Sequence, residues 1–186
     1  SLTNLKAAYQ LDNDFFFFFK EKRAIGGVTE PLNFGDKEVE ELNFSCDPGA
    51  TKLVLEAEVP LTIATGNLCL QAFFGSKELD RIEAKDTAIS DYIYQNISQW
   101  YSYGEQLIGQ EGFYMWDLVS AIYLTNPDLF INQYCILKSN MEDLREGKLV
   151  LKASKNDSKD ISITNYINVP TKIKDQAKFK ELVFEA

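Results

Sequence analysis

The chain has 186 residues, of which 45% are hydrophobic and 13% aromatic, and this composition indicates a globular protein with a real hydrophobic core. Its formal net charge is −9 and it has no cluster of Lys or Arg, which argues against nucleic acid as a partner. The sequence contains no histidine, which excludes Ser-His and Cys-His catalysis and every histidine-containing zinc site.

The cysteines indicate the redox compartment of the protein, and the length of the apolar runs indicates whether it contacts a membrane. Cys46, Cys69 and Cys135 are widely spaced and form no Cys-x-x-Cys pair. This spacing predicts buried thiols in a reducing, cytoplasmic setting rather than disulfides or a metal cluster. The longest aromatic run, Phe15 to Phe19, is far too short to span a bilayer, so we expect no membrane partner. The chain begins at Ser1 without an initiator Met, which indicates a processed or truncated product whose leader is not seen.

Helix and strand signals alternate along the chain. A short helix is expected soon after Leu2, and residues 24–27 predict a strand whose backbone turns at two glycines. Residues 30–41 contain Pro, Asn, Gly and many acids, which predicts a loop. Asp47 and Pro48 predict a helix start, with Asp47 as the N-cap and Pro48 in the first helical position.

The rest of the chain continues the alternation. The expected elements are a strand over 59–64, a turn at 66–67 that leads into a helix through Phe74, helices over 87–109 and 112–124, strands at 134–137, 148–152 and 161–163, and a helix over 176–186. Strands alternating with helices predict an α/β layered domain with a central, mostly parallel sheet, flanking helices and extra strands near the C-terminus. No repeat or low-complexity linker divides the chain, so we expect a single domain over residues 1–186.

The stretch from Gly112 to Leu124 is the main candidate for function, because Asp117 directly follows Trp116 at the start of an apolar helix. The positive end of the helix dipole favours an anion there, which suits a functional carboxylate. The same position suits an ordinary capping or charge-matching Asp, and Trp116 could be a core residue. The stretch by itself leaves both interpretations open.

Four blocks of the sequence resemble those of one family, in the same order. Leu2-Thr-Asn4 resembles a PLTN element, and Ile25-Gly-Gly27 followed by Asn33 resembles an MGG…N segment. Glu41-Leu-Asn-Phe44, then Asp47-Pro48 and Val59-Pro60, is similar to an EFN…DPEAA…VP block. The last block of this chain is Asp117 followed by Ala121, Tyr123, Leu124, Pro127 and Phe130. It resembles the family's HD…A-Y-L…P-LF block. Over nearly its whole length the chain therefore resembles the calcium-dependent nucleoside hydrolases of the inosine-uridine-preferring superfamily.

The resemblance implies a calcium site. In that family the Thr of PLTN offers its backbone carbonyl, which corresponds to Thr3, and the Asp of the last block is a side-chain ligand, which corresponds to Asp117. Calcium takes oxygen ligands, in keeping with a chain that lacks His and clustered Cys. A plain helix residue at Asp117 and a frayed chain end at Thr3 are the alternatives.

The resemblance also implies a site for a small nucleoside. Asn33, Glu41 and Asn43 correspond to residues that hold the ribose hydroxyls, although Asn33 lies further from Glu41 than is usual in the family. Trp116 stands where many members have a His that faces the base, and in this it resembles the purine-specific members. The alternatives are loop hydrogen bonding for the three polar residues and core packing for Trp116.

One element of the family has no counterpart in this chain. The N-terminal DTDxGxDDA segment supplies most of the calcium ligands and the general base, and Asp12-Asn-Asp14 does not replace it. No catalytic residue is therefore assigned within the chain. The resemblance covers the C-terminal half to two-thirds of a family member, which implies an incomplete nucleoside-hydrolase-like fold.

The implied activity is hydrolysis of the N-glycosidic bond of ribonucleosides, with purines preferred, to free base and ribose by the full-length enzyme. Such a reaction passes through an oxocarbenium-like cation that carboxylates and hydroxyl contacts stabilise. One alternative is a non-catalytic protein that binds ribose or a nucleoside, or another protein, after losing the metal-binding segment. Another is a fragment completed by a second chain. Whether the protein is a homo-oligomer is left open.

Overall fold

The computed structural model describes residues 2–109, 111–153 and 166–184. The helices are α1 Thr3–Leu11, α2 Pro48–Glu56, α3 Gly66–Cys69, α4 Ser76–Glu83, α5 Ala88–Ile108, α6 Trp116–Thr125, α7 Met141–Arg145 and α8 Gln176–Phe184, with 3₁₀ turns η1 Phe15–Phe18 and η2 Pro127–Leu129. The strands are β1 Lys22–Ile25, β2 Leu32–Phe34, β3 Lys37–Val39, β4 Leu61–Ala64, β5 Phe73–Phe74, β6 Phe113–Tyr114, β7 Phe130–Ile131, β8 Tyr134–Leu137, β9 Leu151–Ala153, β10 Tyr166–Asn168 and β11 Lys172–Ile173.

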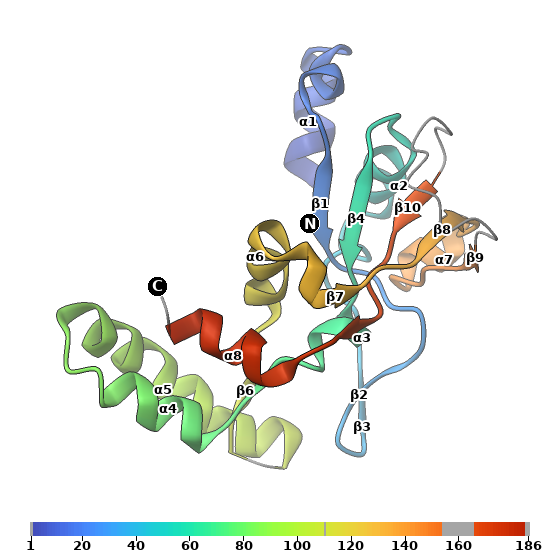
Figure 1. The fold of residues 1–186 in the computed structure, drawn as a ribbon. Coiled ribbons are helices and arrows are strands. Elements are labelled where there is room, and N and C mark those ends of the chain that lie inside the picture. Colours follow the sequence, from blue (N-terminus) through green and yellow to red (C-terminus); the bar gives the residue numbers. More distant parts are fainter. Residues whose placement is uncertain (1, 110, 154–165, 185–186) are drawn as a thin grey trace.

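A five-stranded sheet with the order β1-β4-β10-β8-β9 forms the centre of the fold (Figure 1). Strands β1, β4 and β10 run parallel, and β8 and β9 continue the sheet antiparallel. This confirms the predicted α/β class, with its parallel central strands and the additional strands near the C-terminus. Within the described part of the chain, no strand pairs with the outer edge of β1.

Two hydrophobic cores lie against the sheet. One joins Ala64 at the end of β4 to α3, α6 and α8, and Val119 and Phe179 are fully buried in it. The other packs α2 and α7 against Leu61 and Ile63 of β4. Side chains of a strand point alternately to its two faces, so β4 contributes to both cores. Helices therefore cover the sheet on both sides, as predicted.

Local sequence signals explain α2 and β4. The Asp47 carboxylate accepts a hydrogen bond from the Ala50 backbone N–H at 2.9 Å, and Pro48 occupies the first turn. This is the N-cap arrangement that the sequence predicted. The apolar run after Pro60 forms β4, which lies between β1 and β10 in the sheet.

Three local predictions were wrong. Residues 30–41 are not a loop: β2 and β3 form an antiparallel hairpin around Gly35 and Asp36. The helix expected to run through Phe74 is a single turn, α3, followed by β5. Residues 113–114 are a strand that pairs with β5, so α6 begins only at Trp116. The strand expected at 161–163 lies outside the described residues.

Helices α4 and α5 form a pair that lies beside the sheet rather than on it, and we call them the arm (Figure 1). The β5–β6 ladder connects the arm to the rest of the fold. Gly104 allows a close approach at this point, because a Cβ there would lie 1.7 Å from the Gly112 carbonyl oxygen. At the other side of the arm, Arg81 of α4 makes a two-point ion pair with Glu181 of α8, at 2.7 and 2.9 Å.

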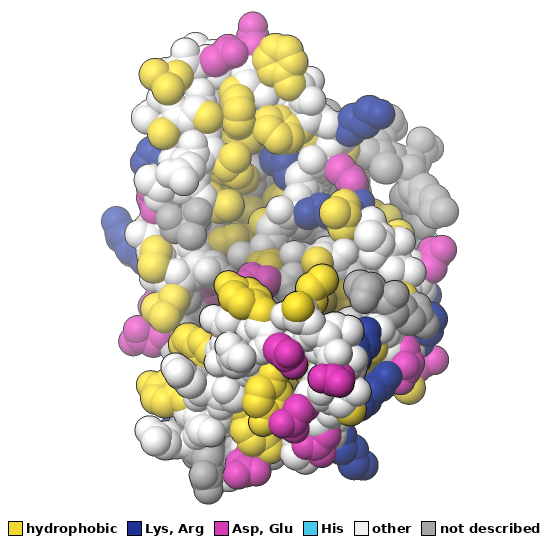
Figure 2. Space-filling model, turned by 90° about the vertical axis from the view of Figure 1, so that its left-hand side faces the viewer, with side chains coloured by type: hydrophobic (Ala, Val, Ile, Leu, Met, Phe, Trp, Pro, Cys, Tyr) yellow, Lys and Arg dark blue, Asp and Glu magenta, His cyan; other side chains and the backbone are white. Residues whose placement is uncertain are grey.

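Large hydrophobic side chains remain exposed on this molecule. Within the phenylalanine run Phe16 is buried, whereas Phe17 and Phe18 are each 78% exposed. Figure 2 shows hydrophobic side chains gathered in and around a central hollow on the face that lies to the left in Figure 1. Among the described residues, no helix is both long and apolar enough to cross a membrane.

The cysteines differ from the prediction in one case. Cys69 and Cys135 are buried thiols, as expected, but Cys46 is exposed in the loop before α2. All three are free thiols, which agrees with the prediction that they form no disulfide framework.

Lys22 of β1 is a buried cation, with 7% of its surface exposed. Its ammonium group donates to the carbonyl oxygens of Val54 at 2.5 Å and Ala57 at 3.0 Å, where α2 ends. These carbonyls have no partner within the helix, so Lys22 caps the C-terminus of α2. Burial nevertheless lowers the pKa of Lys22 from 10.5 to about 8.

This lowered pKa predicts a pH-dependent stability. Between pH 8 and 10.5 the unfolded chain holds the Lys22 proton more tightly than the folded chain, so this group makes folding more favourable as pH rises. Relative to Lys22→Met, the native chain should gain on the order of 1–2 kcal/mol of unfolding free energy between pH 7 and pH 10. Urea unfolding at both pH values measures this gain. The control is Lys20→Met, the same change at an exposed neighbour. If the native chain gained as much unfolding free energy relative to Lys20→Met as relative to Lys22→Met, the assignment to Lys22 would be contradicted.

Candidate functional site

Two neighbouring cavities share part of their lining, and one of them lies at the carboxyl ends of β1 and β4. The first, of about 530 Å³, we call the amide cavity; it is lined by Ile25, Gly26, Leu32, Phe34, Val39, Glu40, Glu41, Leu42, Asn43, Gly66 and Trp116. The second, of about 470 Å³, we call the aromatic cavity; it is lined by Phe34, Ile97, Trp100, Tyr103, Gly104, Gly112, Phe113, Tyr114, Met115, Trp116, Asp117 and Leu118. Phe34 and Trp116 belong to both linings.

Glu41 organises the amide cavity. One carboxylate oxygen accepts from the backbone N–H groups of Gly27, Asn43 and Phe44 at 3.1, 2.8 and 3.0 Å. The other accepts from Phe44 and Ser45, each at 2.9 Å. The side chain is 8% exposed. These bonds occupy most of the acceptor capacity of the carboxylate, so its first role is to hold the turn after β1 against the loop before α2.

Gly147, just after α7, leaves the space that the Glu41 carboxylate occupies. Its φ of +67° lies in the left-handed region, and a Cβ there would lie 2.2 Å from Glu41 Oε2. A side chain at this position would therefore collide with the carboxylate and displace it from the amides.

The two predicted asparagines are placed differently. Asn43 is exposed and lines the amide cavity, and its backbone is fixed by Glu41. Asn33 is also exposed, but it lies on β2, and among the described residues its side-chain amide donates only to the Pro31 carbonyl, at 3.5 Å. It lines neither cavity. The structure thus brings together Glu41, Asn43 and Trp116 but not Asn33.

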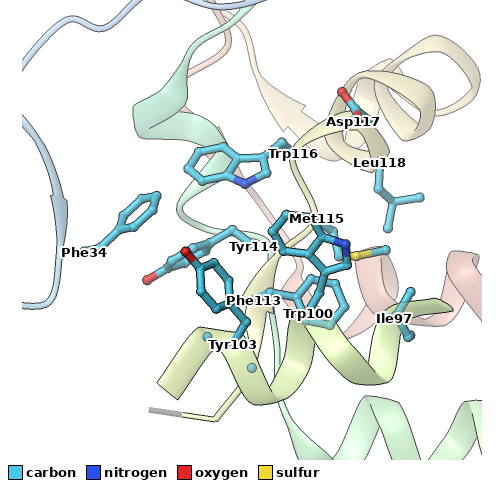
Figure 3. A pocket seen from close by; sticks show the side chains of 12 residues that line it. Phe34, Ile97, Trp100, Tyr103, Phe113, Tyr114, Met115, Trp116, Asp117 and Leu118 are labelled. Carbon is cyan, nitrogen blue, oxygen red and sulfur yellow. The ribbon is translucent and has the colours of Figure 1, made fainter. Parts of the chain in front are cut away.

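The aromatic cavity lies between the main fold and the arm (Figure 3). Trp100 and Tyr103, one helical turn apart on α5, meet edge to face with ring centres 5.9 Å apart. On the opposite wall Trp116 lies 5.6 Å from Tyr114 and 5.5 Å from Phe34. Trp116 is half-buried, so its ring is available to the cavity rather than lost in the core.

Asp117 is an exposed carboxylate in the first turn of α6, at the rim of the aromatic cavity. The N-cap residue of α6 is Met115, and no side chain caps the helix. In the described part of the chain the Asp117 carboxylate accepts no hydrogen bond, so the simple capping interpretation finds no support. Burial, together with the charge of Asp117, raises the pKa of the Cys69 thiol to about 12. Cys69 is therefore neutral and not a nucleophile.

Thr3 lies in the first turn of α1 and its hydroxyl donates to Asp47 Oδ2 at 2.8 Å. It lines neither cavity, whereas Asp117 lines the aromatic one. Calcium requires about 6–8 oxygen ligands. Among the described residues no three Asp, Glu or Cys side chains lie close enough together to hold a metal. These residues alone do not fit a calcium ion.

Sequence reasoning missed the aromatic residues that pack beside Trp116. Phe34 was assigned to a loop, and Tyr114 to a helix that begins only two residues later. A signal for the hairpin was present, since Gly35-Asp36 between Leu32–Phe34 and Lys37–Val39 is a typical two-residue turn. Gly35 has the positive φ, +59°, that such a turn requires at its first position.

The amide cavity lies at the carboxyl ends of the parallel strands β1 and β4, the edge of the sheet at which α/β proteins commonly bind ligands. The sequence model of the inosine-uridine preferring nucleoside hydrolases matches residues 1–181. The chain belongs to this family. No curated protein matches it in sequence.

Solved nucleoside hydrolases share the fold. A plant nucleoside hydrolase has a TM-score of 0.81 and 19% identity, with 99% of this chain and 58% of that chain covered. The purine-preferring ribonucleoside hydrolase from Gardnerella vaginalis has a TM-score of 0.75 and 17% identity, covering 97% and 55%. The inosine-uridine preferring enzyme from Bacillus anthracis has a TM-score of 0.71 and 17% identity, covering 99% and 56%. The chain thus spans little more than half the length of these relatives.

The Glu41 arrangement leads to a stability prediction. Glu41→Ala leaves buried amides of Gly27 and Phe44 without an acceptor, which should lower the free energy of unfolding by about 2–4 kcal/mol. Glu40→Ala, the same change at an exposed neighbour, should cost less than about 0.5 kcal/mol. Urea unfolding measures both, and equal effects would contradict the anchoring role of Glu41.

Proposed function

We propose that this chain forms the ribose- and base-binding part of a nucleoside hydrolase that prefers purines. The reaction is hydrolysis of the N-glycosidic bond of a ribonucleoside to free base and ribose. The observation that carries the proposal is the position of Trp116, which separates a cavity lined by Asn43 and Glu41 from a cavity lined by aromatic rings. A nucleoside has the same division, with a hydroxylated sugar on one side and a flat base on the other.

Ribose would lie in the amide cavity. Asn43 offers an exposed amide that can both donate to and accept from sugar hydroxyls. Glu41 fixes the backbone of Asn43 and lines the same cavity, so it positions Asn43, and it would accept from a sugar hydroxyl only in place of one of its amide donors. Asn33 would reach the sugar only if the β2–β3 hairpin moved, and it is the weakest member of the proposed set.

The base would lie in the aromatic cavity against Trp116. Stacking of a base on an aromatic side chain contributes about 1–3 kcal/mol in other systems. A purine covers more ring surface than a pyrimidine, which is the reason for the proposed purine preference. Trp100 and Tyr103 of the arm close the cavity on the opposite side.

Calcium is the cofactor that the family resemblance implies, with Asp117 and the Thr3 carbonyl as ligands. An exposed carboxylate at the positive end of α6 suits this role. The remaining oxygens would have to come from outside the described residues, so we assign no step to the metal. The lack of an acidic cluster among the described residues favours one second candidate, a protein that binds nucleosides without hydrolysing them.

Ribose release from inosine, adenosine and uridine, measured with calcium and with chelator, tests the proposal. We expect calcium-dependent release, fastest with purines, from the complete enzyme of which this chain is the proposed binding part. Asp117→Asn should reduce it at least tenfold, because the amide removes the charge of the only side-chain ligand assigned in this chain. The matched control is Asp128→Asn in η2, which lines neither cavity and should not change the rate.

The other outcomes separate the candidates. Inosine binding without release above the buffer rate would support the non-catalytic candidate. Neither binding nor release would contradict both.

The incomplete ligand set leads to a separate prediction for the metal. Calorimetric titration of this chain with calcium should give a dissociation constant in the millimolar range or weaker, because about 6–8 oxygens are required and few are present. Micromolar binding that Asp117→Asn abolishes would show that the described residues do suffice.

A further inference from the structure

Phe34 and Trp116 are the two side chains that line both cavities, and we call this pair the aromatic partition. Their ring centres are 5.5 Å apart and the rings are tilted by 31° (Figure 3). Phe34 also meets Tyr114 at 5.3 Å. A ligand that occupies both cavities at once must therefore pass beside or between these rings.

The hairpin that carries Phe34 is attached at its two ends. At its base Leu32 is buried, and its methyl groups lie close to Gly66. Near its tip Lys37 donates to the Gln106 carbonyl of α5, at a long 3.5 Å. Its strands have three residues each, and within the described part of the chain they pair only with each other. The attachment is firm at Leu32 and weak beyond it, so a movement about Leu32 would displace Phe34.

We propose that Phe34 is a specificity-determining residue, whose ring stacks on the face of the base opposite to Trp116. The inference rests on the proposed function, because it requires a base beside Trp116. Phe34 then provides a second stacking surface beside Trp116, and the β2–β3 hairpin, which the sequence did not predict, carries it. The base is then held between the two rings of the partition, with ribose in the amide cavity.

The Phe34 and Trp116 rings must move apart before a base can lie between them. A flat base between two rings needs one van der Waals separation on each face, roughly 7 Å between the ring planes. The two rings now have their centres 5.5 Å apart and leave no space for a base, so their planes must separate by one further van der Waals thickness, roughly 3.5 Å. Without ligand the two rings pack on each other, and the base replaces that contact with two stacking contacts. A bicyclic purine fills both faces more completely than a pyrimidine, so the second ring increases discrimination.

Trp fluorescence gives a test that does not depend on catalysis. The sequence has two tryptophans, Trp100 and Trp116, and both line the aromatic cavity. Inosine and uridine are titrated with both tryptophans in place, and dissociation constants are read from the change in total Trp emission. Phe34→Leu is compared with Phe73→Leu, a matched control. Phe73 packs on Tyr114 at 5.3 Å in the same ring cluster but lines neither cavity.

We expect Phe34→Leu to weaken inosine binding about tenfold and uridine binding about two- to threefold, since it removes one stacking face. Phe73→Leu should change both by less than about twofold. Equal losses of inosine binding in the two variants would overturn the role of Phe34 while leaving the proposed function intact. Tighter inosine binding in Phe34→Leu would also overturn it, because the ring would then be an obstruction. No emission change with inosine, even with Phe34 present, would contradict the base site at Trp116 itself.

Discussion

The site depends on the buried carboxylate of Glu41. Backbone amides from the end of β1 and from the loop before α2 converge on its two oxygens. A buried carboxylate is costly unless hydrogen bonds replace its water, so the amides and the charge stabilise each other. Because Asn43 is one of the donors, the same interaction that joins two loops also places the amide that faces the cavity.

The second constraint is the arrangement of rings around Trp116. Residues far apart in the sequence meet there: Phe34 comes from the β2–β3 hairpin, Trp116 starts α6, and Trp100 lies on the arm. The hairpin and the arm are each attached to the central sheet through short strands or loops, whereas α6 packs directly on β1. Trp116 is therefore on a wall fixed to the sheet, whereas Phe34 and Trp100 are carried by elements that join the sheet only through short strands or loops.

The sequence predicted the elements whose signals are local. The N-cap of α2, the apolar run of β4 and the helical period of α5 each involve neighbouring residues, and each was confirmed. The hairpin was missed because its polar composition suits a loop equally well, and only the Gly35-Asp36 pair favours a turn. The four-amide environment of Glu41 was not predictable, since its donors come from two loops that meet only in the folded chain. The position of Asn33, outside both cavities, follows from the same missed hairpin.

In the proposed site, binding and bond cleavage make different demands on the described residues. The amide cavity and the aromatic cavity provide the amides, rings and shape that the proposed sugar and base sites need. Cleavage additionally needs charge placed to stabilise an oxocarbenium-like transition state, and there the described site offers one exposed carboxylate, Asp117, at its rim. An isolated carboxylate in water stabilises a nearby cation only weakly, because solvent screens the interaction. More of the described residues therefore support the proposed recognition of a nucleoside than support its proposed hydrolysis.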